Sequence, residues 1–249
     1  MSRPAPWAAA TRAQTAVELR LTARRGENLL AIAVIPVAVL LFFASTSIVA
    51  LPGGESVATL LPGAIALAII AAGLVNLGIA TAYERSYGVL KRLGGSPLGR
   101  SGLVAAKTIS VAAIVAIQVV ALVVVAMVVL GWRPGEDTSV LVLLAAAALG
   151  TVTFAALGLL LAGTLRAEAV LALANGLFLA ALLVGGILVP AASLPGPLAA
   201  VATILPSAAL AELLRVGFGA GGDPVAPMIV LTAWAAGAVV LAARTFRWD

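Results

Sequence analysis

The chain contains no histidine and no cysteine among its 249 residues. Their absence removes the commonest metal ligands, the Ser–His and Cys–His nucleophile pairs and any disulfide bond. Charged residues are also scarce, at 10% of the chain, where an ordinary soluble domain has about 25%. Apolar residues make up 63%, which is more apolar surface than a soluble chain of this length can bury. The composition therefore argues against a soluble enzyme and predicts a membrane protein.

Long stretches without any charged residue indicate where the chain crosses the membrane. They cover residues 28–54, 56–83, 108–132, 138–165, 169–211 and 224–243. A membrane-spanning helix needs about 20 apolar residues, so five stretches hold one crossing each, and prolines break the longest after residue 190. We therefore expect an all-α polytopic membrane protein, a single transmembrane domain over 1–249 with six transmembrane helices. The predicted spans are 28–50, 57–82, 106–130, 139–163, 168–189 and 226–244.

The distribution of basic residues predicts the orientation. If the N-terminus is cytoplasmic, 13 of the 15 Lys and Arg residues fall in cytoplasmic segments, whereas Asp and Glu divide evenly. This asymmetry is what the positive-inside rule describes. We expect a multi-pass protein of a bacterial cytoplasmic membrane with both termini in the cytoplasm. The placement leaves no basic face for a nucleic-acid partner.

Residues 1–27 precede the first expected span and carry several arginines among apolar residues. This mixture is typical of a helix that lies at the membrane interface, in contact with membrane lipids, with its arginines at the headgroups. A disordered basic leader is the alternative.

The expected cytoplasmic loop between the second and third spans reads as a short amphipathic helix within 84–99. Tyr87, Leu90 and, less regularly, Leu93 recur at helical spacing, and Gly94-Gly95 followed by Pro97 can end the helix. Such a helix can insert into a cleft of a soluble partner. A helix that only covers the end of its own bundle fits the periodicity equally well.

The expected external segment, 191–218, contains Leu-Pro pairs that divide it into two short re-entrant helices joined near Pro206. Glu212 and Arg215 stand three residues apart, so they can pair on one helix face at the interface.

Two motifs together resemble those of type-2 ABC exporter permeases, a class that includes drug, polysaccharide and lipid exporters. The first is Glu84-Arg85-x-x-Gly88 followed by Leu93 and Ser96-Pro97-Leu98, which resembles the family's coupling helix. The second runs from Val184 to Arg215 and resembles the family's external segment before the last span. The resemblance extends over the whole chain in length, span count and orientation.

The resemblance implies a non-catalytic permease subunit that binds a separate ABC-type ATPase and pairs with a second permease, as a homodimer or heterodimer. It implies no cofactor in this chain, with ATP and Mg²⁺ held by the partner. Residues expected to couple to the ATPase are Glu84, Arg85, Tyr87, Gly88, Leu90, Leu93 and Pro97. Residues expected at an external gate are Pro190, Pro195, Pro206, Glu212 and Arg215.

A few polar residues within the expected spans are candidates for a translocation path: Thr46, Asn76 and Asn175. Polar groups in lipid must find a partner or a wet cavity, although most simply join neighbouring helices. Because aromatic residues make up only 5% of the chain, a sugar-stacking conduit is disfavoured, and we expect a hydrophobic drug-like compound or lipid as cargo.

Three other function classes fit the sequence less well. An ion-coupled secondary transporter is the main alternative, but such proteins place charged residues at the membrane centre. An intramembrane hydrolase would lack a base to activate its nucleophile. A simple membrane anchor needs neither of the two motifs. Gly94-x-x-x-x-Gly99-Arg100-Ser101 imitates a phosphate-binding loop but lacks the flanking strand that such a loop requires.

Overall fold

The computed structural model describes residues 5–24, 26–45, 57–187 and 195–246, and in these ranges the regular structure is helical without a strand. The all-α prediction is therefore confirmed. The helices are α1 (Trp7–Arg24), α2 (Gly26–Ser45), α3 (Val57–Ile70), the π-helix η1 (Ala71–Leu77), α4 (Gly78–Ser86), α5 (Val89–Gly94), α6 (Gly99–Val128), α7 (Val140–Thr164), α8 (Ala167–Val184), α9 (Gly196–Ala202), α10 (Pro206–Gly217) and α11 (Val225–Thr245).

Within the described ranges, five helices are long and apolar enough to cross a membrane: the continuous run α3–η1–α4, α6, α7, α8 and α11. The apolar part of α2, Val34–Ser45, is shorter than these five helices. Five of the six predicted spans correspond to these helices, whereas the first, 28–50, runs past Ser45, where the described part of α2 ends. Three boundaries differ by four residues or more, and one of them is the end of the fifth span, at Val184 instead of residue 189. The second span continues beyond residue 82 to Ser86, and the third begins at Gly99 instead of residue 106. Both helices extend into sequence that carries charge, because their ends leave the apolar part of the bundle.

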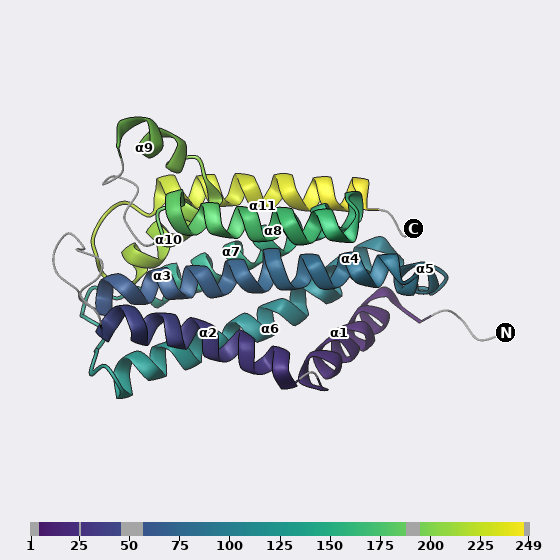
Figure 1. Cartoon of the computed structure of the whole chain (residues 1–249), viewed down its shortest axis with the longest axis horizontal. Helices are drawn as coiled ribbons and strands as arrows, with labels where there is room; N and C mark the ends of the chain where they lie inside the picture. Colours follow the sequence, from purple (N-terminus) through teal and green to yellow (C-terminus); the bar gives the residue numbers. More distant parts are fainter. Residues whose placement is uncertain (1–4, 25, 46–56, 188–194, 247–249) are drawn as a thin grey trace.

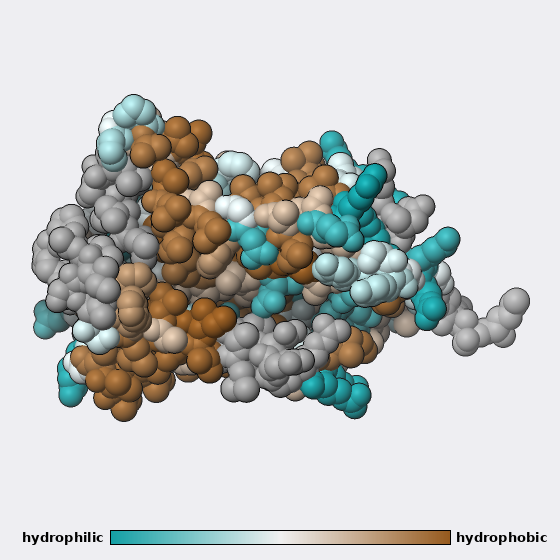
Figure 2. All heavy atoms as spheres, in the orientation of Figure 1, coloured by the Kyte–Doolittle hydropathy of each residue, from teal (hydrophilic) through white to brown (hydrophobic). Residues whose placement is uncertain are grey.

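The long helices lie side by side along the bundle (Figure 1). The start of α1, the end of α11 and the short helix α5 lie at one end, whereas α9 and α10 lie at the other. We call these the α5 end and the α9 end. Hydrophilic residues gather mainly at the α5 end, and hydrophobic residues cover much of the rest of the face shown in Figure 2. The two segments with motifs therefore lie at opposite ends of the molecule, as the predicted topology requires.

The run α3–η1–α4 forms the middle of the bundle, and residues 61–70 are all buried. It packs closely against α7, because Gly73 and Gly158 meet where neither helix carries a side chain. A Cβ atom added to Gly158 would lie 2.4 Å from the carbonyl oxygen of Gly73. The absence of side chains at these positions therefore allows the two helices to pack closely.

Candidate functional site

The predicted helix over 84–99 is wrong in its boundaries, because two helices share this segment. α4 continues from the membrane span and ends at Ser86, and α5 begins at Val89. Gly88 separates them with a φ of 71°, a left-handed conformation that glycine adopts without strain. The N–H of Gly88 donates to the carbonyl of Arg85, which closes the end of α4. α5 ends at Gly94 as expected, although neither Gly94 nor Gly95 adopts the left-handed conformation that often ends a helix; Gly95 has a φ of −79°.

The α4–α5 corner is fixed firmly to the rest of the bundle. Leu90 is fully buried in the hydrophobic core. The guanidinium of Arg85 donates a hydrogen bond to the carbonyl of Leu165, in the link between α7 and α8. The rings of Tyr83 and Tyr87 pack with their centroids 6.1 Å apart. A displacement of α5 would therefore have to move its own span and the α7–α8 link as well.

The burial pattern changes the roles expected for two residues. Leu90 was expected to contact a partner protein, but a side chain with 0% exposure cannot do so. Glu84 was expected to begin the cytoplasmic helix, but it lies within α4, and its carboxylate faces Lys107. The exposed apolar side chains of the corner are instead Tyr87 at 74% and Val89 at 41%.

The remaining exposed residues of the corner are basic or lie in the turn that follows. Lys91 and Arg92 are exposed, Leu93 is half-buried, and Pro97 is exposed shortly before α6. The corner therefore presents two apolar side chains beside two cations.

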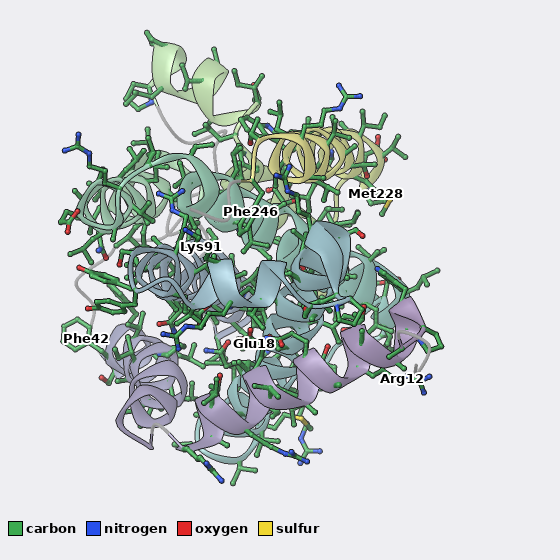
Figure 3. All side chains as sticks on the ribbon, turned by 90° about the vertical axis from the view of Figure 1, so that its right-hand side faces the viewer. Arg12, Glu18, Phe42, Lys91, Met228 and Phe246 are labelled. Carbon is green, nitrogen blue, oxygen red and sulfur yellow. The ribbon has the colours of Figure 1, made fainter. Side chains whose placement is uncertain are left out.

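A buried ion cluster lies next to this corner and was not predicted. Lys107 of α6 is 1% exposed, and its Nζ atom lies 2.7 Å from Oε2 of Glu84 and 3.0 Å from Oε1 of Glu18. The cluster joins α1, α4 and α6 through one ammonium group. Figure 3 looks onto the α5 end and shows Glu18 pointing from α1 into the bundle, whereas Arg12 points away from it. A lysine at the start of an expected span, with glutamates on two neighbouring segments, was the available signal.

Asn76 lines a cavity of about 90 Å³ beside this cluster, together with Glu84, Lys107 and Ser110. Asn76 belongs to η1, and π-helical turns often occur at functional sites. Asn76 is exposed, and it shares this cavity with charged side chains, so its place on a translocation path stays a prediction.

The other two candidates for a translocation path do not join Asn76. Asn175 is exposed on α8, and its amide donates to the carbonyl of Leu171 on the same helix at 2.8 Å. It does not line the cavity of Asn76. Thr46 lies outside the described residues.

The segment before the last span forms two short helices as predicted. α9 and α10 meet at a bend of 83°. Pro195 precedes α9, and Pro206 is the first residue of α10, a position where a missing N–H costs no helical hydrogen bond. Pro190 lies outside the described residues.

Arg215 does not form the exposed interfacial pair that its spacing with Glu212 suggested. It is 6% exposed, and its guanidinium donates to the carbonyls of Gly186 and Ile187. The carboxylate of Glu212 is 3.4 Å away and half-exposed. Arg215 therefore joins α10 to the end of α8, and Glu212 is the weaker of its partners.

The molecule is a helical membrane bundle with an anchored corner at one end and a bent helix pair at the other. The sequence model of the ABC-2 type transporter family matches residues 10–218. The chain belongs to the ABC-2 type transporter family. The match covers both motifs, so the resemblance drawn from them is confirmed, and the chain is the membrane permease component of an ABC transporter. No curated protein gives a significant sequence match.

Proposed function

We propose that this permease is one subunit of an ATP-driven exporter that moves a hydrophobic drug-like compound or lipid outward across the cytoplasmic membrane. A separate ATPase supplies the energy, and ATP and Mg²⁺ bind there. In this arrangement the α5 end and both termini face the cytoplasm. The family supports the ATPase partner, and the excess of Lys and Arg in the segments expected to be cytoplasmic supports the orientation.

The observation that carries the proposal is the α4–α5 corner. It offers Tyr87 and Val89 to a partner, while buried Leu90 and the Arg85–Leu165 hydrogen bond hold it to the bundle. Because the corner is firmly anchored, a movement of a soluble partner bound to its surface can be transmitted to the membrane-spanning helices. Burying one large apolar side chain stabilises a contact by roughly 1.5–3 kcal/mol.

A second permease completes the proposed assembly. α8 leaves Leu173, Leu179 and Leu183 exposed, so it has apolar surface for a neighbouring helix. Pairs of such permeases are usual in the family, and a shared cavity between two bundles would then lie along the path of the cargo.

The experiment compares Val89→Asp with the wild type in vesicles that contain the permease and its ABC-type ATPase. We expect the variant to lose transport and stimulation of ATP hydrolysis, because a carboxylate at the contact would have to be desolvated. Val225→Asp is the matched control, since Val225 is 57% exposed at the opposite end. Both variants must be inserted at wild-type levels. Normal transport and stimulation by Val89→Asp would exclude the corner as the contact.

A further inference from the structure

A cavity of about 450 Å³ lies between α7, α8, α9 and α11, and it shares no lining residue with the cavity beside the ion cluster. Its inner wall is buried, with Phe154 at 3% and Ala181 at 9% exposure. Its outer wall is partly exposed, with Leu198 at 44% and Val201 at 50%. The cavity therefore begins at the surface of the bundle and reaches into its interior.

The lining has the chemistry of a hydrocarbon site. Leucine, alanine, valine and aromatic side chains form it, no charged residue contributes, and Ser207 supplies one hydroxyl. The volume falls within the range of about 300–1,000 Å³ that is typical of ligand pockets. Because its outer wall belongs to the apolar part of a membrane bundle, the compounds that reach it are those dissolved in the bilayer.

Trp234 holds the link between α9 and α10 next to the cavity. Its indole N–H donates to the carbonyl of Ile204 at 2.8 Å, which ties α11 to the link between α9 and α10. The indole ring lines the cavity, while its polar atom is occupied by this hydrogen bond. A backbone carbonyl next to lipid needs such a partner, so the bond holds α9 beside the opening.

We propose that this cavity binds one hydrocarbon chain, that of a bilayer lipid or of a lipid-like cargo. The inference that the bound hydrocarbon belongs to the cargo rests on the proposed function. Binding of the hydrocarbon itself requires neither ATP nor the ATPase. The site lies beside α9 and α10, so a bound chain and the bent helix pair share a wall. The cargo class that follows is compounds with a hydrocarbon chain.

Tryptophan fluorescence tests the proposal directly. Replacing Trp7, Trp132 and Trp248 by Phe in the full chain leaves Trp234 as the single tryptophan. In one arm, the vesicles contain unbrominated phosphatidylcholine and increasing amounts of a brominated fatty acid. In the other, the phosphatidylcholine itself carries brominated chains. Bromine quenches the indole only at short range, so quenching reports a chain in contact with the ring.

We expect quenching by the fatty acid to saturate and to be reversed by an unbrominated fatty acid. Ala180→Phe should raise the half-saturating fraction by about tenfold, which corresponds to about two CH₂ groups that are no longer buried. Ala172→Phe is the matched control, because Ala172 is exposed on the same helix outside the cavity.

The two arms distinguish the sources of the chain. Saturable quenching by the brominated fatty acid indicates that the bound hydrocarbon comes from a lipid-like cargo. Quenching by brominated phosphatidylcholine indicates a bilayer lipid if the Ala180→Phe substitution removes it. Quenching that is proportional to bromine content and equal in all variants would overturn the proposal, because Trp234 would then meet only surrounding lipid. Absence of quenching in the wild type would also overturn it, as expected if a second copy covers the opening. A failure of transport would leave these results unchanged.

Discussion

Replacing Lys107 by Met tests the ion cluster, because methionine keeps much of the side-chain length and removes the charge. Lys107 is the single cation between two carboxylates. Its loss leaves Glu18 and Glu84 facing each other without compensation. Replacing either glutamate by Gln, in contrast, leaves the ammonium paired with the remaining carboxylate. We therefore expect an unequal response among the three single variants.

The burial of the ion cluster determines how much stability the Lys107→Met variant should lose. Removing one partner of a buried ion pair costs about 3–5 kcal/mol. The side chains of Glu18 and Glu84 are 14% and 24% exposed, so water reaches both carboxylates in part. The lower end, about 3 kcal/mol, is therefore the appropriate value. For a chain of this length it corresponds to a fall in melting temperature of roughly 6–12 °C.

The assay is thermal unfolding of the purified permease in one detergent, and the decisive variant is the triple substitution Glu18→Gln, Lys107→Met and Glu84→Gln. With no charge left, the triple variant should recover most of the stability lost by Lys107→Met, because the cost arises from unpaired carboxylates. Each glutamate variant alone should lose less than Lys107→Met. The reasoning is refuted if Lys107→Met melts like the wild type, or if the triple variant is no more stable than Lys107→Met.

Three further predictions concern other parts of the chain. Arg215→Gln should lower the melting temperature clearly, because the buried carbonyls of Gly186 and Ile187 lose their donor, whereas Glu212→Gln should change it little, since partly exposed pairs contribute about 0–1 kcal/mol. Gly158→Ala should destabilise the fold or reduce insertion, because its Cβ would clash with Gly73, whereas Gly176→Ala has open space and should be tolerated in the same expression and melting assays. In a chain without native cysteine, Ser86→Cys should react with an impermeant thiol reagent from the cytoplasmic side only and Thr203→Cys from the outside only; the reverse pattern would invert the proposed orientation.

The spans and the bent helix pair could be predicted because each depends on local sequence. A membrane crossing needs a long run without charge, and the prolines at 195 and 206 stand where helices begin. These requirements are met or broken within about 20 neighbouring residues. The helical content and the division of the external segment were therefore available without any knowledge of packing.

The details of the site depended on contacts between distant segments. Leu90 has the same helical spacing as an exposed contact residue, and only the neighbours of α5 show that it is buried. Glu18, Glu84 and Lys107 are separated by 66 and 23 residues along the chain, so no local pattern pairs them. The break at Gly88 was hidden because glycine is tolerated within helices as well as between them. Tertiary context decided each of these points.

The two buried cations also indicate which cargo the bundle suits. Lys107 and Arg215 are the charged residues that the described ranges bury; Lys107 contacts α4 next to the α4–α5 corner, and Arg215 belongs to α10 at the α9 end. Each is held by partners from other segments: two carboxylates for Lys107, and two backbone carbonyls with Glu212 for Arg215. Neither cation lines the large cavity, whose described lining carries no charged side chain. A charged group that left water there would meet no compensating side chain, whereas an apolar chain would lose nothing. This difference in desolvation cost favours a hydrophobic cargo.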